Sequence, residues 1–185
     1  MFQQNIIELF SSKRLSKYES FDEYLENIKI SQRYYPQLHL IEISLRNKIN
    51  NILTQNLGVN WIIENINYIP QDQRSKLKSE LLHDDMLANL TFGTWIHILN
   101  KYYRLFSDAD LSYILGLSRK QINSQFNKLC NELKIIKNYR NRVFHYEKIN
   151  NHHQYHNIEH LIDKFIRLLD IDNVLEEAVR KLKAN

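Results

Sequence analysis

Helix-breaking residues are scarce in this chain, and their scarcity limits the folds that it can adopt. Its 185 residues include only 3 glycines and 2 prolines. Because glycine and proline mark turns and end helices, a sequence with so few of them favours long helices joined by short connections. The hydrophobic fraction of 43% and the charged fraction of 25% are ordinary for a soluble globular protein. The sequence therefore predicts an all-α fold, a bundle of about six to nine helices in a single domain over residues 1–185.

Apolar residues at spacings of three and four locate the helices of this bundle. The two longest are expected over 30–55 and 118–142, and Pro36 should kink the first of them or start it afresh. A separate helix over 21–28 is expected before them, with Ser20 as its N-cap and Glu23 completing a capping box. Further helices are expected within 5–18, over 72–88 and 95–99, over 108–115, over 151–169 and over 173–183, with Asp72 and Asp172 as caps.

Charge, cysteine content and the lack of long apolar runs narrow the class of protein. The formal charge is +4 and the pI is about 9.0, which mildly favours a polyanionic partner. No apolar run reaches the length of a membrane span, so we expect a cytoplasmic protein with no membrane partner. The single cysteine, Cys130, fits that compartment and is predicted to be a small core residue rather than a nucleophile.

The segment 137–147, at the expected end of a long helix, is the part of the sequence most informative about chemistry. Arg140 and His145 are five residues apart, and such a pair at a helix terminus can converge on one pocket. The arginine fork matches a phosphate, and a histidine near neutrality can move a proton to or from an alcohol. The amide of Asn141 can orient an imidazole or a phosphate oxygen. Together these are the groups that metal-independent RNA cleavage requires, with a 2′,3′-cyclic phosphate and a 5′-hydroxyl as products.

The pattern Arg140-Asn141-x-x-x-His145 resembles the Arg-Asn-x-x-x-His signature of HEPN domains. Three blocks are more narrowly similar to the Abi-like (abortive infection) family of bacterial HEPN proteins. They are Ile-Glu-Ile-Ser-Leu-Arg-Asn at 41–47, Leu-Thr-Phe-Gly-Thr-Trp at 90–95 and Tyr-Arg-Asn-Arg-Val-Phe-His-Tyr-Glu at 139–147. The segment 12–18, Ser-x-Arg-Leu-x-x-Tyr, looks like the opening of such proteins. The resemblance therefore extends over roughly residues 10–150.

This resemblance implies a HEPN-type helical bundle with additional N- and C-terminal helices. It also implies an endoribonuclease that acts as a toxin or abortive-infection effector in phage defence or growth control. HEPN sites usually combine two motifs across a dimer, so a homodimer is implied, with RNA as the substrate and a small structured RNA as the antitoxin. We expect neither a metal nor a cofactor. The residues carried over are Arg140, Asn141 and His145 as catalytic, and Glu42, Arg46, Asn47, Arg142 and Tyr146 as substrate-binding or supporting.

Tyr146 departs from the family pattern in two ways. The HEPN toxins inactivated by a nucleotidyltransferase antitoxin carry their tyrosine one residue later, so control by nucleotidylation is in doubt. The family's frequent second histidine is also replaced by Tyr146, which puts an auxiliary proton transfer from this position in question.

Other interpretations of the same residues stay open. Glu42 and Arg46 are four apart and can form an ordinary ion pair on a solvated helix face. Residues 108–130 read as a short helix, a turn at Gly116 and a second helix, which is typical of a DNA-binding helix-turn-helix. That second helix continues for more than twenty residues, whereas a recognition helix is normally shorter. A non-catalytic HEPN module that binds RNA or a protein partner is the remaining alternative.

Two further groups of side chains could bind ligands. His152, His156 and His160 are spaced for one helical face and, with His153, could hold zinc, but no cysteine completes a site, and Glu159 and Asp163 are the nearest acidic candidates. A solvated or RNA-facing surface is the simpler interpretation. The tyrosine pairs at 34–35 and 102–103 could stack unpaired bases, although tyrosines at helical spacing more often pack with their hydroxyls at the rim.

Overall fold

The computed structural model describes residues 4–78, 81–149, 155–170 and 173–183, and these ranges contain helices and no strand. The prediction of an all-α fold is confirmed. The α-helices of the described chain are α1 (Gln4–Phe10), α2 (Ser12–Leu15), α3 (Phe21–Leu57), α4 (Trp61–Glu64), α5 (Gln71–Arg74), α6 (His83–Asn89), α7 (Phe92–Lys101), α8 (Asp108–Leu115), α9 (Arg119–Phe144), α10 (Ile158–Leu169) and α11 (Val174–Lys183). Two 3₁₀ helices, η1 (Ile66–Tyr68) and η2 (Tyr103–Leu105), connect them.

The longest helix, α3, joins two segments that the sequence predicts as separate helices. Ser20 is its N-cap and accepts a hydrogen bond from the backbone N–H of Glu23, as predicted. The expectation that Pro36 could start the helix afresh is wrong, because one helix continues through it to Leu57. Proline lacks the N–H that would donate to the carbonyl of Gln32, four residues earlier, and because Gln32 is exposed, water can hydrogen-bond to that carbonyl.

Two other helix predictions fail at their boundaries. The expected helix over 72–88 divides into α5 and α6, and Pro70 rather than Asp72 is the N-cap of α5. Arg74 ends α5 and donates to the carbonyl oxygens of Ile69 and Asn67, which ties this short helix back to the preceding turn. The helix expected from residue 151 begins at Ile158, and Asp172 lies outside the described residues.

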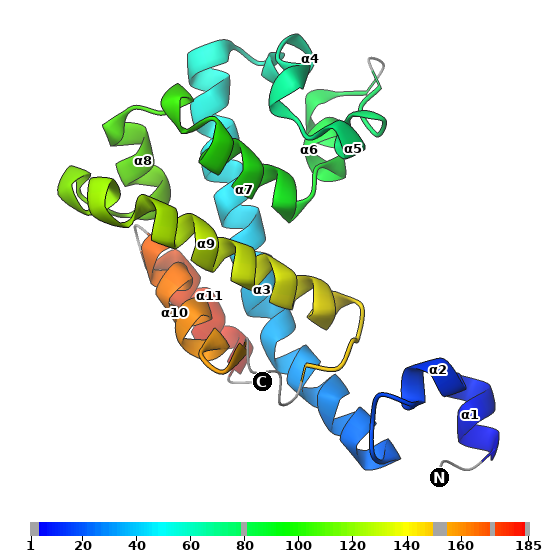
Figure 1. Cartoon of the computed structure of the whole chain (residues 1–185). Coiled ribbons are helices and arrows are strands. Elements are labelled where there is room, and N and C mark those ends of the chain that lie inside the picture. Colours follow the sequence, from blue (N-terminus) through cyan, green and yellow to red (C-terminus); the bar gives the residue numbers. More distant parts are fainter. Residues whose placement is uncertain (1–3, 79–80, 150–154, 171–172, 184–185) are drawn as a thin grey trace.

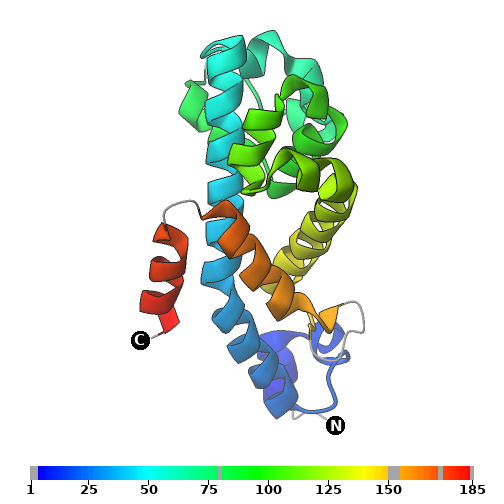
Figure 2. The same cartoon turned by 90° about the vertical axis from the view of Figure 1, so that its left-hand side faces the viewer.

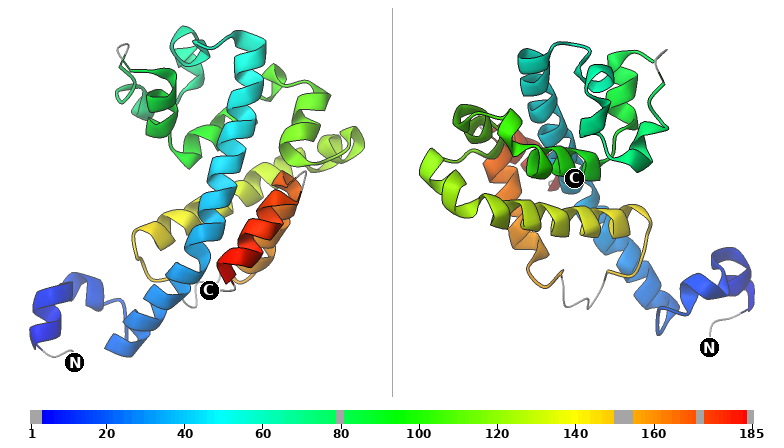
Figure 3. Two further views of the ribbon diagram at one scale, coloured as in Figure 1. Left: turned by 180° about the vertical axis from the view of Figure 1, so that it is seen from behind. Right: turned by 45° about the horizontal axis from the view of Figure 1, so that its top comes forward.

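The fold is organised around the crossing of α3 and α9, with α7 and α10 packed against both. Figure 1 shows α9 passing over the middle of α3, and Figure 3 shows the same crossing from behind and from above. Helices α4 to α7 gather around the C-terminal half of α3, whereas α10 and α11 lie beside its middle (Figure 2). The main core is apolar, and its fully buried members include Leu38 and Leu45 of α3, Trp95 of α7, Leu133 of α9 and Phe165 of α10.

A second, smaller core attaches the N-terminal helices to the start of α3. Leu15, Tyr18 and Tyr24 are its buried members. The rings of Tyr18 and Tyr24 meet edge to face, with centroids 5.2 Å apart, and Phe10 packs against Tyr24 in the same manner. This core fixes α2 and the basic residues around it beside the first turns of α3.

The structure bears on the predictions for Cys130 and for membrane-spanning helices. Cys130 is buried, as predicted for a core residue, and burial raises the pKa of its thiol to about 11. Little thiolate therefore exists at neutral pH, which disfavours a nucleophilic role. Within the described ranges, no helix combines the length and the apolar character needed to cross a membrane.

Candidate functional site

The C-terminal end of α9 carries the predicted catalytic residues. His145 is the C-cap, and Tyr146 follows it with a φ of 50°, in the left-handed region that aromatic residues rarely adopt. The N–H of Tyr146 donates to the carbonyl oxygen of Val143 (3.2 Å), and the N–H of Glu147 donates to that of Arg142 (2.9 Å). These are the two bonds of a Schellman motif, in which glycine normally occupies the position of Tyr146. Because glycine would form this turn with less strain, the tyrosine side chain is a candidate for a role beyond the turn.

The guanidinium of Arg140 is held by a carboxylate from α3. Its Nε and Nη2 each lie 2.8 Å from Oε2 of Glu42, and its Nη1 donates to Oδ1 of Asn141 at 3.3 Å. The side chains of Arg140 and Glu42 are 23% and 11% exposed, so this pair is more desolvated than an ordinary surface ion pair. A guanidinium has five N–H groups, and these contacts use three. The other two stay available for another acceptor, such as a phosphate.

Arg140 also belongs to a column of stacked side chains. Its Cζ lies 3.9 Å from the ring centroid of Phe144. The ring of Tyr35, from α3, stacks on Phe144 with centroids 4.1 Å apart and planes 14° apart. Phe144 is thus packed between a cation and a second aromatic ring, which restricts the rotamers of all three side chains. Tyr35 is 46% exposed, so part of its ring faces solvent at the end of the column.

A buried amide fixes the chain that follows α9. The Nδ2 of Asn27, in α3, donates to the carbonyl oxygen of Glu147 (3.0 Å), and its Oδ1 accepts from the backbone N–H of Ile149 (2.8 Å). Asn27 is fully buried, and Ser31 donates to its carbonyl oxygen (2.8 Å). One side chain therefore satisfies two backbone groups of residues 147–149 and sets the position of the preceding turn.

An ion pair reinforces this attachment at the first turn of α3. The Nζ of Lys148 lies 2.6 Å from Oε1 of Glu23, and it also lies 5.4 Å from the ring centroid of Tyr18. The hydrogen bond from Lys148, together with one from the backbone N–H of Glu19, lowers the pKa of the Glu23 carboxyl below its ordinary value of 4.5. The chain after α9 is thereby anchored both to α3 and to the N-terminal core.

His145 lines a pocket of about 250 Å³ between the end of α9 and the segment 11–18, which we call the basic pocket. Four cationic side chains and the carboxylate of Glu147 line it. The cations are Lys13, Arg14, Lys17 and Lys148. Lys148 is paired with Glu23, whereas the three cations of the N-terminal segment form no ion pair within the described part of the chain. The imidazole of His145 is exposed and has no hydrogen-bond partner among the described residues. An anion in this pocket would therefore meet three cations that have no carboxylate partner among the described residues, with Glu147 as the one acidic side chain of the lining.

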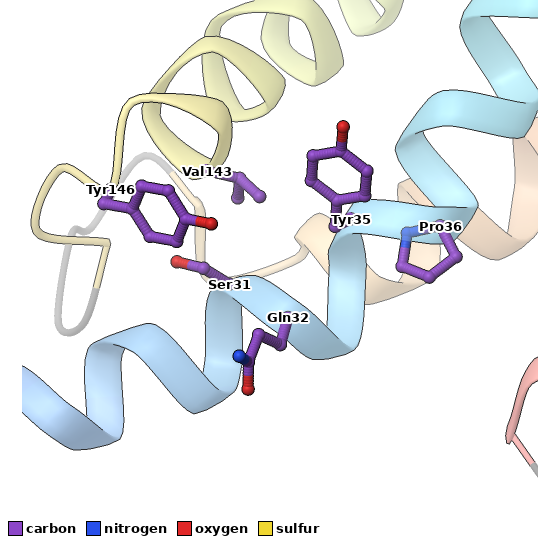
Figure 4. Close-up of a pocket in the computed structure, with 6 residues that line it drawn as sticks. All are labelled: Ser31, Gln32, Tyr35, Pro36, Val143 and Tyr146. Atoms are coloured by element: carbon purple, nitrogen blue, oxygen red, sulfur yellow. The ribbon is translucent and has the colours of Figure 1, made fainter. Parts of the chain in front are cut away.

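A second pocket, of about 240 Å³, lies on the other side of Tyr146, and we call it the tyrosine pocket. It is formed by Tyr146 and Val143 from the end of α9 and by residues of one stretch of α3, namely Ser31, Gln32, Tyr35 and Pro36. Figure 4 shows Tyr35 standing on α3 at one side of this pocket and the ring of Tyr146 reaching toward α3 from the other. Tyr146 lines both pockets, so the two adjoin at this side chain.

The other predicted residues occupy different positions around this centre. Arg142 lies 3.6 Å from the carboxylate of Glu147 and donates to the carbonyl oxygen of Lys148 (3.2 Å), so it braces the turn. Arg46 and Asn47 lie further along α3 and hydrogen-bond to each other at 3.2 Å. The alternative of a Glu42–Arg46 ion pair is wrong, since the carboxylate of Glu42 faces Arg140 across the helix crossing.

The three blocks that resemble the Abi-like family meet along the last turns of α9. The first block supplies Glu42, which pairs with Arg140 of the third block. The second block begins α7, where a Cβ on Gly93 would lie 3.5 Å from Cδ of Lys137, three residues before Arg140. However, Arg140 and Asn141 are absent from the residues that line the basic pocket, whereas His145 lines it.

Two sets of side chains that shape this region are not predicted from the sequence. Asn27 falls on the buried stripe of α3, at the spacing of its apolar neighbours Tyr24, Tyr34 and Leu38, and a polar residue on such a stripe signals a buried hydrogen-bonding role. The cations of segment 11–18 could have been noticed as a basic cluster. Their approach to His145 could not, because it depends on how α2 packs against α3.

The alternative sites have less support in the structure. His156 and His160 are exposed, whereas His152 and His153 lie outside the described residues. Among the residues that the structure does describe, no group of three or more His, Cys, Asp or Glu is placed to hold a metal ion. In the helix-turn-helix candidate, Arg119 is paired with Asp108 and Ile122 is buried, and α9 continues for 26 residues. These features describe a packed corner of the bundle.

Comparison of the chain with protein-family models, with curated proteins and with solved structures finds no match. A functional assignment therefore depends on the residues and geometry of this region and on the three blocks that resemble the Abi-like family.

Proposed function

We propose that this protein is a metal-independent endoribonuclease of the HEPN type, an Abi-like effector in phage defence or toxin–antitoxin growth control. The observation that carries the proposal is the arrangement at the end of α9. There, Glu42 orients Arg140 while leaving two N–H groups available, and His145 is exposed and unpartnered among the described residues, beside a pocket rich in cations. A preorganised cation and an imidazole free to transfer a proton are the two requirements for this reaction.

In the proposed reaction His145 removes the proton from a 2′-hydroxyl. The 2′-oxygen attacks the adjacent phosphorus, the bond to the 5′-oxygen breaks, and this leaving oxygen takes a proton from water. Arg140 stabilises the negative charge of the pentacovalent phosphate, and Asn141 orients the phosphate or the imidazole. The products are a 2′,3′-cyclic phosphate and a 5′-hydroxyl. The reaction needs no metal and no cofactor.

The active form in this proposal is a homodimer. Arg140 is not among the residues that line the pocket beside His145, and we propose that a second copy completes the site. This agrees with the composite sites that the resemblance implies. Sedimentation at the assay concentration tests the point, and a monomer that cleaves RNA at full rate would contradict it. A small structured RNA is the antitoxin that the resemblance suggests, and RNA recovered with the purified protein would be its first sign.

Cleavage of mixed cellular RNA in excess chelator tests the activity. The wild-type protein should leave cyclic phosphate ends, and His145→Ala and Arg140→Ala should each lower the rate by about 10²-fold or more. Matched controls are His39→Ala, an exposed histidine of α3, and Arg33→Ala, an exposed arginine paired with Glu159. Both controls should cleave like the wild type. Full activity of His145→Ala would refute the assignment.

Two other functions make different predictions in this assay. A non-catalytic HEPN module would bind RNA without cleaving it, and the mutations of Arg140 and His145 would then change binding alone. A helix-turn-helix protein would prefer duplex DNA and would depend on the start of α9. The pairing of Arg119 with Asp108 and the burial of Ile122 disfavour the second function.

A further inference from the structure

The basic pocket and the tyrosine pocket differ in chemistry, although they share a wall. One is lined by four cations together with His145 and Glu147. The other is lined by two tyrosine rings, a proline and a valine, with Ser31 and Gln32 as its polar members. Their common member is Tyr146, which the left-handed turn after α9 holds between them. An anionic group and a flat apolar group that belong to one ligand could therefore occupy the two pockets together.

The tyrosine pocket has the features of a site for a nucleobase. Phe144 covers one part of the Tyr35 ring, whereas Tyr35 is 46% exposed and Tyr146 is 45% exposed. Aromatic rings exposed beside a pocket are platforms on which unpaired bases stack. The hydroxyl of Tyr146 and the amide of Gln32 offer polar contacts to the edge of a base. The volume of about 240 Å³ is suited to a small planar group.

The basic pocket has the features of a site for a phosphate. Lys13, Arg14 and Lys17 are exposed and form no ion pair in the described part of the chain, although the chain as a whole carries only a small excess of positive charge. They lie on one short segment that the N-terminal core fixes against α3. Because this segment is anchored, the backbone that carries the cations loses little conformational freedom on binding.

We propose that these two pockets bind one unpaired nucleotide of the RNA substrate, with its base beside Tyr35 and Tyr146 and its phosphate among Lys13, Arg14 and Lys17. This inference rests on the proposed ribonuclease function and names the subsites that present RNA to it. The sugar then lies against Tyr146, and its 2′-hydroxyl lies near the imidazole of His145. The column of Tyr35, Phe144 and Arg140 of the same copy stands beside the base site. The nucleotide must be unpaired, since a base in a duplex could not enter the tyrosine pocket.

Binding of an uncleavable ligand tests the subsites separately from catalysis. The probe is a short fluorescent 2′-O-methyl oligoribonucleotide of mixed sequence, which cannot undergo attack by a 2′-hydroxyl, and the readout is anisotropy at several salt concentrations. A triple variant with Lys13, Arg14 and Lys17 changed to glutamine should bind more weakly. Its plot of log K against log salt should be shallower by about 0.7 for each phosphate that the variant no longer neutralises. The control triple variant changes the exposed Lys120, Lys128 and Lys134 of α9 to glutamine, with the same reduction in charge and no expected change in binding.

The tyrosine pocket is tested with Tyr35→Leu and Tyr35→Phe. Loss of a stacking ring should weaken binding by about five- to a hundredfold, whereas phenylalanine keeps the ring and should keep most of the affinity. A duplex of the same sequence should compete poorly with the single strand. Circular dichroism of each variant establishes that the fold is retained. Equal binding by wild type, Tyr35→Leu and the N-terminal triple variant would overturn the inference.

The failure of this inference can be told apart from the failure of the proposed function. If the variants lose binding as expected but the wild type cleaves no RNA, the nucleotide site stands and the ribonuclease assignment falls. If the wild type cleaves RNA in chelator and both sets of variants bind and cleave like it, the ribonuclease stands and these subsites are wrong.

Discussion

The two ends of α9 are each flanked by a residue with a left-handed backbone conformation. Before its N-terminal end this residue is a glycine, Gly116, and after its C-terminal end it is a tyrosine, Tyr146. Gly116 ends α8, and Ser118 begins α9 with its N–H donated to Oε1 of Gln121 (3.0 Å). Close to that first end Ile114 and Leu115 are buried, and Arg119 is paired with Asp108. Each residue there has the type that its backbone conformation favours.

The other end of α9 departs from these preferences. A tyrosine adopts the conformation that suits glycine, and an arginine and a glutamate are largely buried as a pair. Asn27 is enclosed among apolar neighbours. Such departures cost stability, and they persist where the side chains are needed for another purpose. This contrast supports the proposal that the second end of α9 serves binding or chemistry, whereas the first end serves packing.

Replacing Gly116 with alanine should produce the largest loss of stability. The new Cβ would lie 2.5 Å from the carbonyl oxygen of Leu168, in the backbone of α10, and alanine is strained at a φ of 62°. The two effects together should lower the free energy of unfolding by about 3 kcal/mol. Denaturant titration followed by circular dichroism gives this value.

The matched control is Gly93→Ala. Gly93 lies within α7, and its new Cβ would meet its nearest neighbours at 3.5 and 3.6 Å, which is ordinary contact. Since alanine is the better helix former, this variant should be more stable by up to about 1 kcal/mol. A Gly116→Ala protein as stable as the wild type would show that α8 does not approach α10 this closely.

Replacing Asn27 with alanine should have the next largest effect, now at the other end of α9. The carbonyl oxygen of Glu147 and the backbone N–H of Ile149 then each lose their hydrogen bond to the Asn27 side chain, and a small cavity is left. We expect a loss of about 2 kcal/mol in the free energy of unfolding. Cleavage should fall further than stability explains, because the turn that carries His145 loses its attachment to α3. Asn138→Ala, at an exposed position of α9, is the control and should change stability by less than about 0.5 kcal/mol.

Much of the helix content could be predicted because apolar periodicity is a local signal. The helix over 108–115, the break at Gly116 and the start of the next helix at Ser118 were all predicted within a residue. Pro36 misled the prediction, since its effect depends on whether the carbonyl of Gln32 is solvated. The boundary at Arg74 was also missed, because it depends on hydrogen bonds to a preceding turn.

The sequence predicts which motif forms the candidate site, but it does not predict which side chains of the site pair with each other. Arg140 and His145 stand out by spacing and chemistry, and Glu42 by its place in a block. The sequence offers Arg46, four positions away, as a possible partner of Glu42, but it does not reveal Arg140, which is 98 positions away. The contact of Asn27 with residues 147–149 has a similar separation, and helical period carries no information about such distances.

Tyr146→Gly sharpens the contrast between the two left-handed residues. Glycine relieves the strain at this φ, so the protein should gain stability, or lose none, despite the missing ring. Tyr146→Ala removes the same ring but keeps a Cβ, so the difference between the two variants isolates the backbone strain, at about 1 kcal/mol. Both variants should bind the oligonucleotide more weakly than the wild type. A glycine variant less stable than the alanine variant would show that the turn is not strained.

The smallest effects on stability are expected when the pH is lowered. They should occur at different pH values for α7 and for the turn after α9. The pKa of His97, in α7, is lowered from its ordinary value of 6.5, first by burial and then by the nearby charge of Lys101. The pKa of Glu23 is lowered from 4.5, first by the hydrogen bond from Lys148. A group whose pKa is lower in the folded state binds protons more tightly when the chain is unfolded, so its contribution to stability is lost as the pH falls.

The two losses should fall in different pH windows. The contribution of His97 is present above pH 6.5 and declines below it, whereas that of Glu23 is present above pH 4.5 and declines below that value. The measurement is the midpoint of urea unfolding from about pH 8 to about pH 3.5 for the wild type, His97→Gln and Glu23→Gln. His97→Gln should flatten the upper part of the curve and Glu23→Gln the lower part. If Glu23→Gln left the curve unchanged below pH 4.5, the Glu23–Lys148 ion pair would not anchor the chain after α9, and that anchorage would rest on Asn27 alone.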